Sequence, residues 1–202
     1  MIAAVVLAAG GGSRFGGTKQ LAVVRGTPLV RRAVEAARGA GIERILVVVG
    51  NDADAVAVAA GPDAEIVRND NWRKGQSSSL VAALDAAHDD VEGVVVLLAD
   101  QPSIREEHVR ALLDASAARP EPIVRLRFAD APGPALLRRD VWDELRRLRG
   151  DVGARALIER RPGLVFDVVI SAPAPLDVDT RADLDRARAD GFDAGCEEPP
   201  PF

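Results

Sequence analysis

Short apolar runs alternate with amphipathic stretches along almost the whole chain. The apolar runs are rich in β-branched residues and predict buried strands at 2–7, 44–49, 64–67, 94–98, 123–128 and 164–169. The stretches between them carry apolar residues at helical spacing, and they predict helices near 29–37, 53–60, 77–87, 103–118, 141–148, 154–159 and 181–189. Such alternation is typical of a mostly parallel sheet with helices on both faces. We therefore predict a single α/β domain over 1–190 with a Rossmann-like, doubly wound sheet, followed by a loose tail over 191–202.

The first predicted strand opens into a loop that is unusually rich in glycine. Residues 7–20 read LAAGGGSRFGGTKQ, with glycine at positions 10, 11, 12, 16 and 17. Without Cβ atoms, such a loop can turn its N–H groups inward and let a phosphate approach the main chain. Arg14 and Lys19 add positive charge to the same loop. We interpret this stretch as a cradle for a triphosphate; the alternative is a glycine-rich turn that only connects two elements.

Two better-known phosphate loops do not fit this stretch. The dinucleotide pattern G-x-G-x-x-G fails because, counted from Gly10 and Gly12, its third glycine falls on Phe15. The P-loop pattern G-x-x-x-x-G-K-[ST] fails because Thr18 and Lys19 stand in the reverse order. A different kind of nucleotide loop is therefore indicated.

A candidate metal ligand follows the fourth predicted strand. Asp100 comes directly after an apolar run, where a carboxylate has little structural reason to exist unless a cation meets it. Mg²⁺ prefers one or two carboxylates together with phosphate oxygens and water. We expect Asp179 to be the second acid, with Asp177 in reserve. As alternatives, Asp100 would only form a turn, or Asp179 would cap the last helix beside a Thr180–Asp183 capping box.

Net charge and apolar composition argue against two kinds of partner, nucleic acids and membranes. The chain has 202 residues and a formal net charge of −5, which argues against a nucleic-acid-binding surface. It has no basic leader and no apolar stretch long enough to span a membrane, so we expect a cytoplasmic protein.

Four sequence boxes, in order, resemble one enzyme family. LAAGGGSRFGGTK is similar to the L-A-A-G-x-x-S-R-[MF]-G-x-x-K signature of MobA-like NTP transferases, whose fold is of the nucleotide-diphospho-sugar transferase type. LLADQP at 97–102, GDVGAR at 150–155 and DVDT at 177–180 resemble further boxes of the molybdenum cofactor cytidylyltransferase (MocA-like) group. The segment 69–79 resembles its N-x-x-W-x-x-G-x-x-x-S stretch, which borders the base and ribose.

The resemblance assigns roles to individual residues. It implies catalytic roles for Lys19 and Arg14 and Mg²⁺ binding by Asp100 and Asp179. It implies nucleotide contacts for Leu7, Ala8, Ala9, Gly10, Gly11, Gly12, Ser13, Asn69, Gly75 and Ser79. The guanylyl branch tends to have L-A-G-G in the first box, so Ala9 favours CTP.

The reaction implied is transfer of CMP to a phosphorylated small-molecule acceptor, molybdenum-bearing molybdopterin, with release of pyrophosphate. One region departs from the group: the proline-bearing loop 131–134, which we expect to lead to the next helix, lacks the histidine of the G-x-x-G-H-P-like segment. The acceptor therefore stays open. Two alternatives are an NAD(P)H-dependent reductase resembling nicotine blue oxidoreductase and a binding module without turnover.

Overall fold

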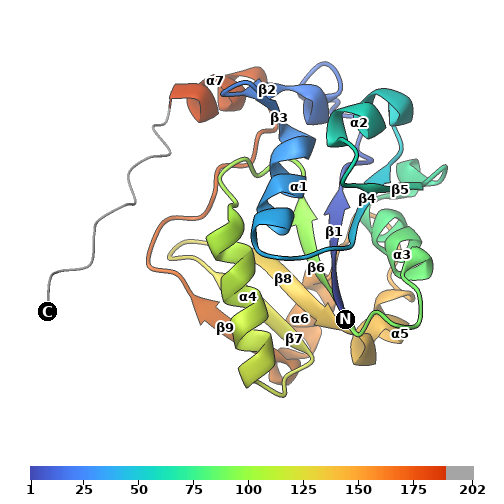
Figure 1. Cartoon of the computed structure of the whole chain (residues 1–202), viewed down its shortest axis with the longest axis vertical. Helices are drawn as coiled ribbons and strands as arrows, with labels where there is room; N and C mark the ends of the chain where they lie inside the picture. The colour runs from blue at the N-terminus through green and yellow to red at the C-terminus, as the bar shows by residue number, and fades with distance from the viewer. Residues whose placement is uncertain (190–202) are drawn as a thin grey trace, which may run out of the picture.

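A seven-stranded sheet forms the centre of the protein. The computed structural model describes residues 1–189, and these form a single domain (Figure 1). The predicted tail over 191–202 lies outside them. The sheet consists of β1 (Ile2–Leu7), β4 (Ile45–Val49), β5 (Glu65–Arg68), β6 (Gly93–Leu98), β7 (Ile123–Arg127), β8 (Pro132–Arg138) and β9 (Val165–Val169). A separate two-stranded hairpin pairs β2 (Val23–Val24) with β3 (Thr27–Pro28).

The strand order in the sheet is β5-β4-β1-β6-β8-β7-β9. All paired strands are parallel except β8, which runs antiparallel to both β6 and β7, so the prediction of a mostly parallel sheet is confirmed. The chain winds from β1 towards β5 on one side and returns to β6 on the other. This reversal places a crevice beyond the carboxyl ends of β1 and β6, where open α/β sheets bind their ligands.

The prediction of a loop at 131–134 was wrong. Residues 132–138 form β8, inserted between β6 and β7. Pro132 and Pro134 cannot donate backbone hydrogen bonds, which is why the sequence indicates a loop. The buried residues Ala135 and Leu136 pair with Val96 and Val95 of β6 and supply the packing that fixes the strand.

Helices cover both faces of the sheet. They are α1 (Leu29–Gly39), α2 (Ala53–Ala60), α3 (Gln76–Ala86), α4 (Glu106–Ala118), α5 (Trp142–Leu145), α6 (Arg155–Arg160) and α7 (Arg181–Ala189). Figure 1 shows α1 and α4 in front of the sheet and α6 behind it. Short 3-10 turns lie at Lys19–Leu21, Trp72–Lys74, Arg139–Val141 and Pro162–Leu164. Within the described range, none of the helices combines the length and apolar character that a membrane crossing needs.

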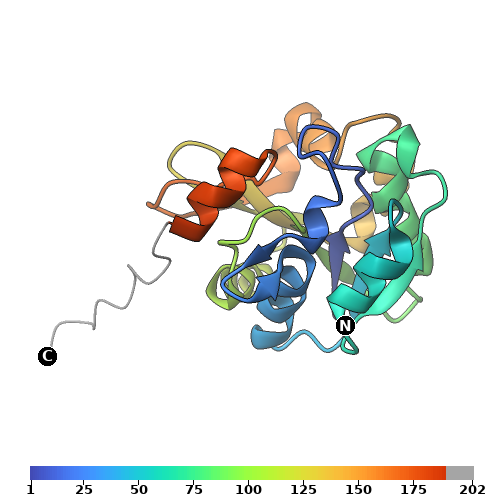
Figure 2. The same ribbon diagram turned by 90° about the horizontal axis from the view of Figure 1, so that it is seen from above.

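The alternation of side chains along β1 divides the core into two layers. Ala4 and Val6 pack with the buried residues of α1, α2 and α4, while Ala3 and Val5 pack with those of α3, α5 and α6. A third, smaller cluster lies apart from the sheet and contains Phe15, Val24, Leu29, Val178, Leu184 and Ala187. It joins the glycine-rich loop to the β2–β3 hairpin and to α7. Figure 2, seen from the end to which β1 points, shows α7 beside this hairpin.

Candidate active site

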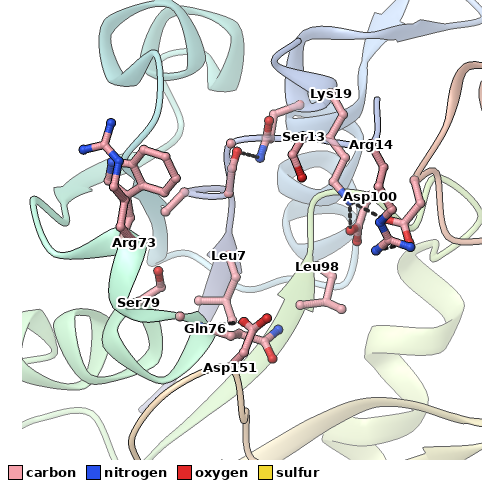
Figure 3. Close-up of a pocket in the computed structure, with 18 of the residues that line it drawn as sticks. Leu7, Ser13, Arg14, Lys19, Arg73, Gln76, Ser79, Leu98, Asp100 and Asp151 are labelled. Atoms are coloured by element: carbon pink, nitrogen blue, oxygen red, sulfur yellow. Dashed lines mark hydrogen bonds and ion pairs between the residues drawn. The ribbon is translucent and has the colours of Figure 1, made fainter. Parts of the chain in front are cut away.

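A cavity of about 700 Å³ opens beyond the carboxyl ends of β1 and β6. The glycine-rich loop after β1 forms one wall, and Asp100 after β6 lies beside Lys19 of that loop at one end of the cavity (Figure 3). Of the predicted site residues, the structure brings twelve to the cavity: Leu7, Ala9, Gly10, Gly11, Gly12, Ser13, Arg14, Lys19, Gly75, Ser79, Asp100 and Asp179. Ala8 and Asn69 are buried and do not line it.

The glycine-rich loop keeps its shape through close backbone contacts. Gly12 has φ +57°, and a Cβ there would lie 2.2 Å from the carbonyl oxygen of Gly17, so only glycine fits. Gln20 is 3% exposed and donates a hydrogen bond from Nε2 to the carbonyl oxygen of Gly10 at 2.8 Å. The sequence did not single out Gln20. Gln20 also lines the cavity, and its buried Oε1 has no hydrogen-bond partner.

Four charged side chains meet at one end of the cavity, which we call the acid cluster: Arg14, Lys19, Asp100 and Asp179. The ammonium nitrogen of Lys19 lies 2.6 Å from Oδ2 of Asp100 and 2.8 Å from Oδ1 of Asp179. Arg14 Nη2 lies 2.9 Å from the other oxygen of Asp179. The side chain of Lys19 is only 14% exposed, so these contacts form in a partly desolvated site. Charges separated by most of the chain therefore meet at one point.

The pKa values of Lys19 and Asp179 favour their charged forms. Burial lowers the pKa of Lys19, but attraction and hydrogen bonds to Asp100 and Asp179 outweigh it, so the net pKa is above its ordinary value. The hydrogen bond from Lys19 is the main cause that lowers the pKa of Asp179. Burial raises the pKa of the neighbouring Asp177, which accepts a hydrogen bond from Gln101 at 2.9 Å.

Two sets of hydrogen bonds hold Asp179 next to Asp100. The backbone N–H of Val178 donates to the carbonyl oxygen of Asp100 at 2.9 Å. Thr180 and Asp183 form the predicted capping box of α7: Asp183 Oδ2 accepts from the Thr180 N–H at 2.8 Å, and Thr180 Oγ1 accepts from the Asp183 N–H at 3.2 Å. Thr180 therefore begins the helix, and the side chain of Asp179 is left to face Lys19.

The acid cluster fits a divalent cation that also binds phosphate. Oδ1 of Asp100 is buried and has no hydrogen-bond partner, which is costly unless a cation or water meets it. Groups of three or more His, Cys, Asp or Glu side chains suited to a metal do not occur within residues 1–189. Two carboxylates with phosphate oxygens and water to complete the shell are the arrangement that Mg²⁺ prefers.

The opposite wall, which we call the α3 end, contains Gly75, Gln76, Ser79 and Asp151. A Cβ on Gly75, whose φ is +99°, would lie 2.4 Å from the carbonyl carbon and oxygen of Gly150. Asp151 Oδ1 accepts from the backbone N–H of Gln76 at 3.2 Å, which caps the start of α3. The sequence box at 150–155 indicated this segment, but not that it closes over α3. Gln76 and Asp151 are thus cavity residues that were absent from the predicted site.

Asn69 and Trp72 both support this wall, but only Trp72 lines the cavity. Nδ2 of Asn69 donates to the hydroxyl oxygens of Ser78 at 2.9 Å and Ser79 at 3.0 Å, so it orients Ser79 without reaching the cavity. Trp72 lines the cavity, and its ring lies 3.1 Å from where a Cβ on Gly11 would be. The guanidinium carbon of Arg73 lies 4.5 Å from the centre of the Trp72 ring. Trp72 therefore packs against the glycine-rich loop and also presents an aromatic surface to a ligand.

A comparison with known families identifies the class of protein. Residues 4–164 match the MobA-like NTP transferase domain. The chain belongs to this family, as the sequence boxes indicated.

Individual relatives cover nearly the same length. Nicotine blue oxidoreductase of Paenarthrobacter nicotinovorans is 35% identical over 175 residues, which are 81% of this chain and 84% of that protein. The crystal structure of Rv0371c from Mycobacterium tuberculosis has a TM-score of 0.82 at 33% identity and covers 94% of this chain and 97% of its own; the same protein has been solved in complex with manganese. A nucleotidyl transferase from Methanothermobacter has a TM-score of 0.79 at 26% identity and covers 94% of this chain and 96% of its own.

The family and these neighbours define a nucleotidyltransferase on a nucleotide-diphospho-sugar transferase fold.

Proposed function

We propose that this nucleotidyltransferase is Mg²⁺-dependent and transfers CMP from CTP to a phosphorylated small molecule, molybdenum-bearing molybdopterin. The observation that carries the proposal is the acid cluster at the mouth of an open glycine-rich loop. Bare amides of the glycine-rich loop line the cavity, and at one end of it two cations meet two acids that could share a divalent cation. A bound Mg²⁺ would supply Lewis-acid neutralisation of charge on the phosphoryl oxygens.

The residues of the chain would bind and orient the reactants. An oxygen of the acceptor phosphate attacks the α-phosphorus of CTP in line, the new O–P bond forms, and the bond to the leaving pyrophosphate breaks. The N–H groups of Gly10, Gly11 and Gly12, together with Arg14, hold the β- and γ-phosphates. Lys19 neutralises charge at the α-phosphoryl group. Because the attacking phosphate is already ionised, positioning and charge neutralisation are sufficient and no general base is needed.

Lys19 must change partners for this to happen. Its ammonium group contacts both acids, and a phosphate can only recruit it once another cation balances Asp100 and Asp179. The manganese complex of Rv0371c, 33% identical to this chain, supports a role for a divalent cation here. Cytidine is favoured by Ala9, and the acceptor rests on the resemblance of the sequence boxes. The cytoplasm, the expected location, is where such a soluble acceptor would be met.

A second candidate function has its own support. Nicotine blue oxidoreductase matches 81% of this chain at 35% identity. In that case the glycine-rich loop would hold the pyrophosphate of a nicotinamide cofactor.

One set of assays separates the two functions. The protein is incubated with Mg²⁺, a molybdopterin fraction and each of CTP, GTP, UTP and ATP, and pyrophosphate is measured; parallel samples contain NADPH and a quinonoid dye, and absorbance is followed. We expect pyrophosphate from CTP and none from the Asp100→Asn variant. If NADPH is oxidised and no nucleotide yields pyrophosphate, the reductase replaces the transferase as the proposed function.

A further inference from the structure

One residue of the glycine-rich loop points away from the cavity. Phe15 is 4% exposed and does not line the cavity. It belongs to the third cluster, together with Val24 of the hairpin, Leu29 of α1 and Leu184 of α7. The amides of Gly10 to Gly12 are therefore attached, through Phe15, to an apolar anchor outside the sheet.

An arginine completes this anchor from the solvent side. The guanidinium carbon of Arg181, the first residue of α7, lies 4.1 Å from the centre of the Phe15 ring. Its Nη2 lies 3.9 Å from where a Cβ on Gly17 would be, so the same group also borders the end of the loop. Arg181 does not line the cavity. It can act on a bound nucleotide only through the loop that it covers.

We propose that Arg181 is a positioning residue: its guanidinium clamps the Phe15 ring and holds the glycine-rich loop in the shape that receives phosphates. The start of α7 then acts on the acid cluster in two ways. Arg181 fixes the glycine-rich loop, and Thr180 caps the helix so that Asp179 faces Lys19. The expected effect of Arg181 on CTP binding rests on the proposed transferase function. The contact of Arg181 with Phe15, and its effect on the loop without ligand, do not depend on that function.

The chain offers a matched control for the clamp. Arg119 lies at the same distance, 4.1 Å, from the centre of the Phe166 ring, on β9. Arg181→Gln and Arg119→Gln therefore remove the same kind of cation–π contact, one at the glycine-rich loop and one at β9.

The first measurement is hydrogen exchange of the amides of residues 10–17 in the full chain without ligand. We expect exchange to rise roughly two- to fivefold in Arg181→Gln, the range for an exposed cation–π contact, and to stay unchanged in Arg119→Gln. Equal exchange in both variants and the wild type would overturn the proposal.

The second measurement tests whether Arg181 acts through Phe15. Phe15→Leu keeps an apolar side chain in the cluster but removes the aromatic face, and Phe15→Met serves if Phe15→Leu does not fold. We expect Arg181→Gln to raise KM for CTP roughly two- to fivefold with kcat nearly constant, and to add nothing in the Phe15→Leu background. An undiminished effect in that background would mean that Arg181 contacts the nucleotide directly, which contradicts the clamp. If exchange changes as expected but no variant, wild type included, produces pyrophosphate, the clamp stands and the proposed function falls.

Discussion

The two ends of the cavity are built by different means. At the acid cluster, charged side chains from the segment after β1, the turn after β6 and the segment before α7 face one another at 2.6–2.9 Å. At the α3 end, the wall is set by backbone contacts, such as Gly75 against Gly150 and the Gln76 N–H on Asp151. The first end concentrates charge in a partly desolvated place, whereas the second fixes shape.

This difference predicts which end of the cavity sets the rate of the chemical step and which end sets substrate binding. Preorganised charge acts on groups whose charge changes during the reaction, so damage to the acid cluster should lower kcat. A wall fixed by the backbone contacts reactant and transition state alike, so damage to the α3 end should lower stability and raise KM.

The sharpest test of this contrast is Lys19→Met. We expect kcat for pyrophosphate release to fall by roughly 10²- to 10³-fold, as for other preorganised charge donors, because the methionine cannot neutralise the phosphoryl group. Lys74→Met, which removes a lysine from the α3 end of the same cavity, is the control and should change kcat far less. Similar losses in both variants would erase the distinction between the ends.

Gly75→Ala tests the α3 end. The new Cβ would meet the Gly150 backbone at 2.4 Å with φ at +99°, so we expect a loss of roughly 2–3 kcal/mol in the free energy of unfolding, measured by denaturant titration. Gly163→Ala is the control, because its Cβ would meet nothing within 4 Å and its φ is not in the left-handed region. A stable Gly75→Ala protein with wild-type KM would show that the close approach to Gly150 is not needed.

Asp151→Ala removes the cap of α3 and a carboxylate from the cavity wall. Gln76 would lose its partner at the start of α3, and we expect about 1 kcal/mol of destabilisation with a raised KM for CTP. Asp151→Asn retains an accepting oxygen and should recover most of this loss. If Asp151→Asn is as damaged as Asp151→Ala, the carboxylate charge rather than the cap is what matters.

The smallest expected effect is the pH dependence of the acid cluster. The hydrogen bond from Lys19 lowers the pKa of Asp179 in the folded state. The stability that this contact adds to the fold is therefore complete above the unfolded pKa of about 4, and it is lost as the pH falls through the lower folded pKa. The free energy of unfolding should therefore fall less between pH 5 and 3, the assay range, in Asp179→Asn than in the wild type. Parallel curves would mean that the Lys19–Asp179 contact contributes nothing to stability.

Much of the fold, and the placement of Lys19 and Asp100 at one edge of the sheet, could be predicted because each depends on local pattern. β1 and β6 are short apolar runs that end in polar residues, and parallel strands bring such ends to one edge. β8 could not be recognised, since Pro132 and Pro134 argue against a strand. Only its place in the sheet, paired with the preceding strand β7 and with the more distant β6, outweighs them.

The site shows the same division. The sequence boxes indicated Asp100 and Asp179, but the contact of both with Lys19 depends on the Val178 hydrogen bond to Asp100, which no local pattern encodes. Asn69 looks like a ligand-binding amide in the sequence, yet its amide is occupied by Ser78 and Ser79. Whether a polar side chain faces a cavity or supports its wall is decided by packing. The catalytic and metal roles remain predictions for the variants above to test.

The separation of Lys19 from Asp179 by 160 residues also bears on how the protein is made. A ribosome releases the glycine-rich loop before it releases Asp179, and a domain generally folds as a unit. The loop must then wait for a further 160 residues before its second acid arrives. A product that stops before Asp179 would keep Asp100 alone, and thus half of its acid pair, so synthesis itself delays assembly of the complete site.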